Sequence, residues 1–247
     1  MPVPEIPVEL LAQIISAAWH MRLSPQELIT LIQSSALVNS TWADTFDLIS
    51  SRDVYIPSAA FCDDFIRRLR TPPPALVHPE PLTTRFRNLF LGRPAKSSPR
   101  RRSANNSCQS ITIQIPNLDV HPPHNRPMRL PMGSVLDDLL EQLDVHSLAP
   151  NLRRLSIEYV DAGFDDVFGR VGLAALPEQV THLDVSYVYS STMPPWLAGA
   201  LQDKQARRKQ FKWRAESVMR LSVFGASEKT VADLVLCCPN VRDVERL

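Results

Sequence analysis

The chain has 247 residues, 44% of them hydrophobic, and a formal net charge of +1. This length suits one large domain or two small ones, and the near-neutral charge gives no overall field to attract a nucleic acid or a membrane surface. No apolar run approaches the roughly 20 residues of a membrane span, and the segment 1–5 has no positive charge ahead of an apolar stretch, so we expect no secretory signal. The four cysteines, scattered or adjacent, favour a reducing setting, cytoplasmic and/or nuclear.

Three short amphipathic helices are predicted at the N-terminus. The first has Pro7 in its first turn, where the missing N–H removes no hydrogen bond. The second follows Ser24-Pro25-Gln26-Glu27, a capping box with proline at the first helical position. Apolar residues at helical spacing are Leu10, Leu11, Ile14, Ile15, Ala18 and Trp19 in the first helix and Leu37, Val38, Trp42, Phe46 and Ile49 in the third. Helices this short cannot hide all their apolar surface from one another, so we expect some of it to meet another surface.

The same residues carry a resemblance to a known family. The order Ile6-Pro7-x-Glu9-Leu10-Leu11-x-x-Ile14-Ile15, then Leu37-Val38-Asn39-x-x-Trp42-x-x-x-Phe46, resembles an F-box. Together with the segment 49–58 it is similar to the F-box-like proteins expanded in mushroom-forming fungi. The resemblance implies that residues 1–57 bind a Skp-family adaptor of a cullin ubiquitin ligase. The residues it implies for adaptor binding are Pro7, Leu10, Leu11, Ile15, Leu37, Val38 and Trp42. The periodicity alone is equally explained by a plain three-helix packing unit.

Prolines divide the rest of the chain. Residues 58–82 are predicted to form a helix over 61–70 and then an extended, proline-rich connector. The segment 93–102 carries five positive charges among serines and prolines, which fits either a nuclear-import or acidic-partner segment or a solvated loop. Prolines also exclude a helix from 116–131.

Residues 83–247 contain a repeated pattern, apolar-x-x-apolar-x-apolar. It is found in Phe86-x-x-Leu89-x-Leu91, Leu152-x-x-Leu155-x-Ile157, Val180-x-x-Leu183-x-Val185 and Val218-x-x-Leu221-x-Val223, and in part at Ser110–Ile115 and Val241–Val244. Helices are predicted between the copies, over 135–148, 164–176, 196–214 and 230–236. The segment 234–242 looks like the cysteine-containing leucine-rich repeats of F-box proteins, although the spacing between copies is irregular. We therefore expect an α/β fold in which degenerate leucine-rich-repeat-like units form a short parallel sheet in sequence order. A small open α/β sheet without repeat regularity is the alternative.

The alternation of the strands leaves one face of this sheet polar. It carries Thr112, Gln114, Ser156, Glu158, Asp184, Ser186, Ser222 and Phe224. Four of these, Glu158, Asp184, Ser186 and Phe224, are the predicted target-binding residues, because Phe224 offers an aromatic anchor beside acidic neighbours. Tyr187 and Tyr189 are expected to follow the strand and border this surface. The alternative is that a loop covers Phe224 and so extends the core.

No residue pattern indicates catalysis, and we expect neither an enzyme nor a cofactor. His121 and His124 lack further ligands and fit a solvated proline loop better than a zinc site. Cys237 and Cys238 end an apolar helix and are expected to pack rather than react. The segment 204–214 carries six positive charges and two aromatic residues, but it fits the cationic end of a surface helix better than a nucleic-acid contact. The expected function is substrate recognition in a Skp–cullin–F-box ubiquitin ligase, with an unidentified protein target; the alternative is a stand-alone interaction scaffold.

Overall fold

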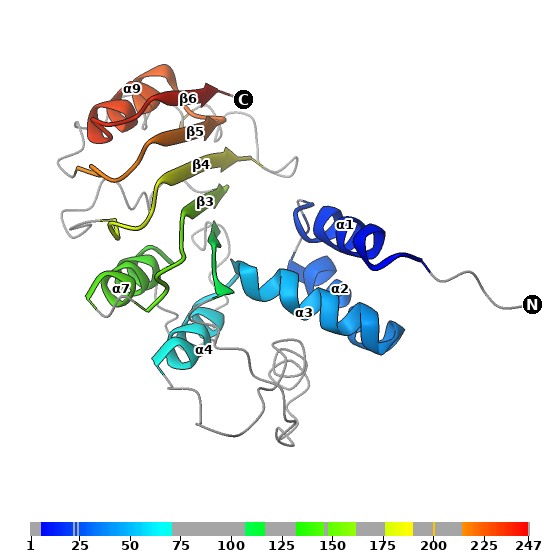
Figure 1. Ribbon diagram of the computed structural model, residues 1–247. Helices are drawn as coiled ribbons and strands as arrows, with labels where there is room; N and C mark the ends of the chain where they lie inside the picture. Colours follow the sequence, from blue (N-terminus) through cyan, green and yellow to red (C-terminus); the bar gives the residue numbers. More distant parts are fainter. Residues whose placement is uncertain are drawn as a thin grey trace, which may run out of the picture. The chain divides into compact units, whose positions relative to one another are not determined.

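The computed structural model describes residues 6–21, 23, 25–70, 107–116, 132–145, 148–161, 176–189, 200 and 214–246. The described residues divide into two compact units. Unit 1 contains those up to Val54 together with Ser107 and Cys108, and unit 2 contains Tyr55–Arg70 and those from Gln109 onward. The elements are α1 (Val8–Trp19), α2 (Pro25–Val38), α3 (Ser40–Arg52), β1 (Asp53–Ile56), α4 (Ala59–Arg70), β2 (Ser110–Pro116), α7 (Met132–Val145), β3 (Arg154–Val160), β4 (His182–Val188), β5 (Arg220–Phe224), α9 (Glu228–Cys237) and β6 (Asp243–Arg246) (Figure 1).

Unit 1 is built on three helices, with α3 in contact with both α1 and α2. Leu11, Ile15 and Trp19 recur every fourth residue of α1 and are all buried. The Trp19 ring meets the Phe46 ring of α3 edge to face, with centroids 5.3 Å apart and planes at 88°, an arrangement that aromatic pairs favour. The indole Nε1 of Trp19 donates a hydrogen bond to the Asp53 carbonyl oxygen at 2.6 Å. This contact fixes the end of α1 against the residue that follows α3.

The boundary between α2 and α3 differs from the sequence prediction. Leu37 and Val38, predicted in the third helix, are the last two residues of α2. Asn39 has extended backbone angles, φ −168° and ψ 173°, and its side chain accepts a hydrogen bond of 2.8 Å from the Trp42 amide. Asparagine is a strong N-cap, so Asn39 ends one helix and starts the next. Apolar residues keep helical spacing on both sides of Asn39, so the sequence pattern predicted one helix where the structure has two.

Unit 2 contains most of a six-stranded sheet in the order β1-β2-β3-β4-β5-β6. Strands β2 to β6 are parallel, each paired with the next in the chain. Register aligns the apolar rows: Leu155 lies opposite Leu183, which lies opposite Leu221, and Ile157, Val185 and Val223 form a second row. All six of these side chains are buried. The predictions of a mixed α/β fold, of parallel strands in sequence order and of these six core residues are confirmed.

Strand β1 was not predicted, although its signal is present. Val54 and Ile56 are buried and alternate with the half-buried Asp53 and Tyr55, which is the period of a strand with one buried face. Tyr55 and Ile56 belong to unit 2. A strand of four residues between two helices is too short to stand out from the helical periodicity on either side.

Helices α4 and α7 of unit 2 pack together, and α7 also contacts β2. The predicted helix 61–70 is α4, and the predicted helices 135–148 and 230–236 correspond to α7 and α9. The buried side chains described on α7 are apolar and include Val135, Leu136, Leu139, Leu140 and Leu143. On α4 the buried carboxylate of Asp64 accepts hydrogen bonds from Arg67 and Arg68, so that the charge taken out of water is neutralised locally. The predicted strand 86–91 lies outside the described residues, as do all of the predicted helix 164–176 except Leu176 and nearly all of the predicted helix 196–214.

Candidate interaction surfaces

Two stripes run along α1 and differ in their contact with solvent. The buried stripe, Leu11, Ile15 and Trp19, forms the core of unit 1. One residue before Leu11 and Ile15 lie Leu10 and Ile14, each 49% exposed. Ile6 and Met21, just outside the two ends of the helix, are 60% and 64% exposed. We call Ile6, Leu10, Ile14 and Met21 the α1 stripe. Apolar side chains with this much exposure on a helix whose other face is already packed form a candidate contact surface.

A second exposed apolar site lies at the end of α2. Leu37 is 75% exposed and Val38 is 53% exposed. They stand directly before the Asn39 cap, where the helix stops and the side chains of α2 no longer have a following turn to cover them. We call Leu37 and Val38 the α2 tip. Trp42, in the first turn of α3, is half-buried, and among the described residues its indole Nε1 has no hydrogen-bond partner.

The structure separates the seven predicted adaptor-binding residues into two groups. Pro7, Leu10, Leu37 and Val38 are exposed, and Trp42 is half-buried. Leu11 and Ile15 are buried between the helices of unit 1, because their positions on α1 face inward. These two side chains therefore stabilise the helical unit and do not offer a free surface. Ile14 and Met21, which the prediction left out, are exposed instead, and the i, i+4 spacing from Leu10 would have identified Ile14.

The polar face of the sheet in unit 2 brings the four predicted target-binding residues together on neighbouring strands. Glu158 lies opposite Ser186 in the register of β3 and β4, and Ser186 lies opposite Phe224 in that of β4 and β5. Asp184 is one row nearer the start of the strands, since residues two apart on a strand share a face. All four are half-buried. We call Glu158, Asp184, Ser186 and Phe224 the sheet-face cluster.

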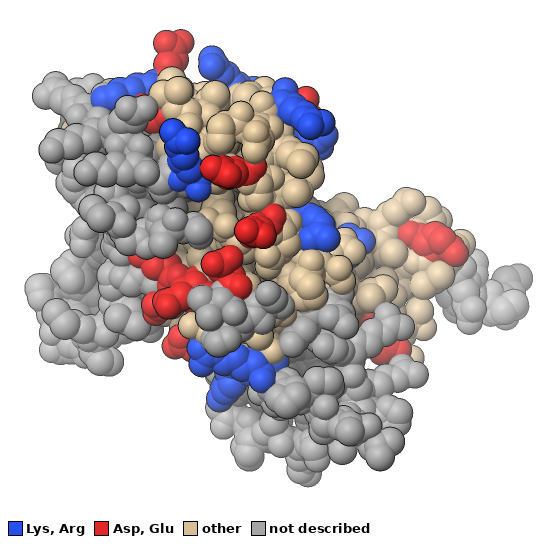
Figure 2. Space-filling view, turned by 60° about the vertical axis from the view of Figure 1, so that its left-hand side comes forward, with Lys and Arg blue, Asp and Glu red and all other residues tan. Residues whose placement is uncertain are grey.

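Asp184 is engaged by its neighbours on this face. Its Oδ2 atom accepts a hydrogen bond of 2.8 Å from the Ser156 hydroxyl and another from Nε of Arg154. Arg220, on the other side of β4, reaches Asp243 at 3.6 Å. Acidic and basic side chains stand close to one another in the view of Figure 2. On this face the charge of Asp184 is thus balanced by Arg154.

The position predicted for Tyr187 is wrong. Tyr187 lies within β4, not after it, and is buried on the apolar face. Its ring stacks on Tyr159 of β3, with centroids 4.8 Å apart and planes at 8°. Burial raises the pKa of the Tyr187 hydroxyl, and among the described residues that hydroxyl has no hydrogen-bond partner. The repeated pattern in the sequence ends at Val185, but the alternation of buried residues in β4 continues for one more step, to Tyr187.

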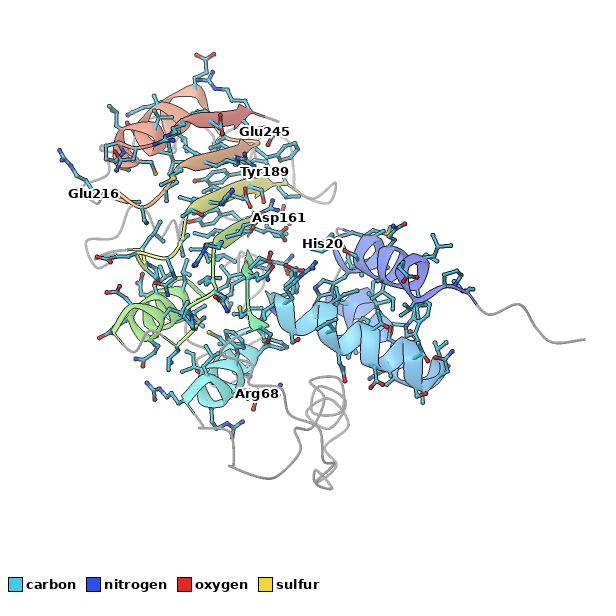
Figure 3. All side chains as sticks on the ribbon, in the orientation of Figure 1. His20, Arg68, Asp161, Tyr189, Glu216 and Glu245 are labelled. Atoms are coloured by element: carbon cyan, nitrogen blue, oxygen red, sulfur yellow. The ribbon has the colours of Figure 1, made fainter. Side chains whose placement is uncertain are left out.

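Tyr189 does follow β4 and is half-buried, near Asp161, the residue after β3 (Figure 3). Burial raises the pKa of Tyr189, and the negative charge of Asp161 raises it further. The Asp161 amide donates a hydrogen bond of 2.8 Å to the Val188 carbonyl oxygen. This contact joins the ends of two adjacent strands.

The cysteines are all buried thiols, as expected for packing residues. Burial raises the pKa of Cys62, Cys108 and Cys238 to about 12, and nearby negative groups add to this effect. Within the described part of the chain, no group of three or more His, Cys, Asp and Glu side chains could hold a metal ion, and no helix is long and apolar enough to cross a membrane. His121 and His124, the segment 93–102 and most of 204–214 lie outside the described residues.

Comparison of the chain with protein-family models, with curated proteins and with solved structures gives no match. The interaction surfaces therefore have to be interpreted from their own chemistry.

Proposed function

We propose that the protein is a substrate-recognition subunit of a Skp–cullin–F-box ubiquitin ligase, in which unit 1 binds a Skp-family adaptor and unit 2 binds a protein target. The observation that carries this proposal is the exposed apolar surface of unit 1. The α1 stripe and the α2 tip remain open although α1, α2 and α3 already share a packed core. The order of apolar residues along these helices is the one that resembles an F-box.

The energetics favour a docking role for these residues. Burying a leucine or isoleucine side chain that is otherwise exposed is favourable by roughly 1.5–3 kcal/mol. Leu10 and Ile14 on α1 and Leu37 on the α2 tip are each about half or more exposed in the chain alone. A partner that covers these residues gains apolar contact that offsets part of the cost of association, and a small number of such anchors commonly dominates interface energy.

Co-purification tests the adaptor half of the proposal. Recombinant full-length chain and a Skp-family adaptor are co-expressed, and the chain is captured by a tag. We expect the adaptor to be retained in a one-to-one complex. A folded chain that never retains the adaptor would favour the alternative, a stand-alone interaction scaffold.

The sheet-face cluster is the proposed target surface. Glu158, Ser186 and Phe224 form one row across three strands, and Asp184 lies beside it within a charge pair to Arg154. Phe224 offers an aromatic anchor and Glu158, in the same row with Ser186 between them, offers a carboxylate, so this row suits a target segment that carries an apolar and a basic side chain. The target half is tested by charge reversal, Glu158→Lys with Asp184→Lys. We expect target capture to be lost while adaptor binding persists; intact capture would remove this face from the proposal.

A further inference from the structure

Strand β6 ends the sheet within the described residues, and its outer edge faces no other described strand. All four of its residues are exposed, and Figure 1 shows β6 at the edge of the sheet, next to the end of the chain. An outer strand presents a row of backbone N–H and C=O groups that can pair with another extended segment. The question is which segment the side chains of β6 admit.

Register assigns each β6 side chain to a face of the sheet. Val244 lies opposite the buried Leu221 and therefore belongs to the apolar face, where it is 42% exposed. Asp243 lies opposite Arg220 and Glu245 opposite Ser222, so both carboxylates belong to the polar face. Arg246 lies opposite Val223 and so belongs to the apolar face, and Asp243 lies 3.6 Å from Arg220. The edge thus offers Val244 and Arg246 on one face and two carboxylates on the other.

This pattern disfavours a second copy of the chain. In a twofold antiparallel pairing of two β6 strands, residues directly opposite share a face. Pairing centred on Val244 sets Asp243 against the Glu245 of the other copy, and pairing centred on Asp243 or Glu245 sets that residue against itself. Like charges directly opposite each other destabilise a strand pair, so the edge is protected from self-association.

We propose that the outer edge of β6 binds an extended segment of a partner protein by strand addition, with basic side chains opposite Asp243 and Glu245 and an apolar side chain opposite Val244. Main-chain hydrogen bonds supply the attachment, and the alternating side chains supply the specificity. The residues of this site are not those of the α1 stripe, the α2 tip or the sheet-face cluster, and the proposal does not depend on adaptor binding.

A short peptide provides the probe. The sequence Glu-Lys-Val-Lys-Glu, capped at both ends and fluorescently labelled, places lysine opposite Asp243 and Glu245 and valine opposite Val244. Its outer glutamates face Arg242 and Arg246, and its symmetry suits either strand direction. Two control peptides are Lys-Glu-Val-Glu-Lys, with the charges exchanged, and Glu-Lys-Pro-Lys-Glu, whose proline removes a backbone donor.

The matched protein variants are Glu245→Lys and Glu216→Lys. Both replace an exposed glutamate of unit 2, but Glu216 lies in the turn before β5, at the other end of the strands from Glu245 (Figure 3). Binding to the full chain is measured by fluorescence anisotropy. We expect the wild-type chain to prefer the basic peptide over the charge-exchanged one by at least about tenfold. Glu245→Lys is expected to reduce this preference at least about threefold, because it turns one of the four charge pairs from attractive to repulsive, and Glu216→Lys to leave it within about twofold.

Three results would overturn the proposal. The first is no binding of the basic peptide at about 1 mM, a concentration that detects even weak association. The second is a preference that Glu245→Lys leaves unchanged. The third is equal binding of the proline peptide, which would indicate charge attraction without strand addition. Adaptor binding is measured separately and is expected to be the same in both variants. A negative result for strand addition at β6 can therefore be told apart from a negative result for the ligase proposal.

Discussion

Leu10 and Leu11 are consecutive in α1, yet Leu11 is 7% exposed and packs in the core of unit 1, whereas Leu10 is 49% exposed. A helix turns by about 100° per residue, so two neighbours with the same side chain lie on different faces. This pair separates the two roles that apolar residues have in unit 1, folding and docking.

The pair makes a matched test of stability. Leu11→Ala is expected to lower the free energy of unfolding by about 2–5 kcal/mol, because it removes buried methyl groups and leaves a cavity. Leu10→Ala is expected to change it by no more than about 0.5 kcal/mol, as for most surface substitutions. Urea unfolding followed by circular dichroism measures both variants. Equal effects of the two substitutions would show that the faces of α1 are assigned incorrectly.

Gly225 provides a test of the sheet. It follows β5 with φ +66°, and a Cβ atom placed there would overlap the Tyr187 carbonyl oxygen. Gly225→Ala is therefore expected to cost at least about 2 kcal/mol, since the left-handed backbone and the overlap both act against it. The neighbouring Ala226→Gly is the control and is expected to cost at most about 1 kcal/mol. A Gly225→Ala variant as stable as the control would contradict the close approach of the two strand ends.

The sequence allowed much of the fold to be predicted, because the strands of unit 2 each bury one face. Alternation at Leu183 and Val185 is enough to indicate a strand, and the repeat of that pattern indicates parallel neighbours. The prediction from sequence falls short where contacts between helices decide which residues are buried. Nothing in the sequence distinguishes Leu10 from Leu11, because both fit helical spacing and only the position of α3 selects the buried one. Asn39 was present as a cap signal, but the apolar residues on both sides of it suggested a continuous helix.

Alkaline pH is expected to destabilise the protein through its buried thiols. Burial raises the pKa of Cys62 from its ordinary value of 9.0 to about 12. The unfolded chain loses this proton first, so the contribution of the thiol to stability is complete below pH 9 and declines as the pH rises from 9 towards 12. Between these two pKa values, one such thiol lowers the free energy of unfolding by up to about 1.4 kcal/mol per pH unit.

The Cys62→Ala variant isolates this effect. Its absolute stability is expected to be lower because of the lost packing, but its free energy of unfolding should fall less steeply between pH 9 and pH 11 than that of the wild-type chain. Urea unfolding at several pH values provides the comparison. The same slope in both proteins would mean that Cys62 is not shielded from solvent. The buried Tyr187, whose pKa is also raised, contributes to both proteins equally.

The central claim, that the exposed apolar residues of unit 1 bind a Skp-family adaptor, is tested most directly by measuring the affinity of three variants by isothermal titration calorimetry. Leu10→Asp changes the α1 stripe, Leu37→Asp changes the α2 tip, and Leu236→Asp is the control, because Leu236 is 62% exposed but lies on α9 of unit 2. Circular dichroism first establishes that all three are folded. We expect Leu10→Asp and Leu37→Asp each to weaken adaptor binding by at least about tenfold, or 1.4 kcal/mol, and Leu236→Asp to bind like the wild-type chain. Folded Leu10→Asp and Leu37→Asp variants that bind the adaptor with unchanged affinity would contradict the central claim.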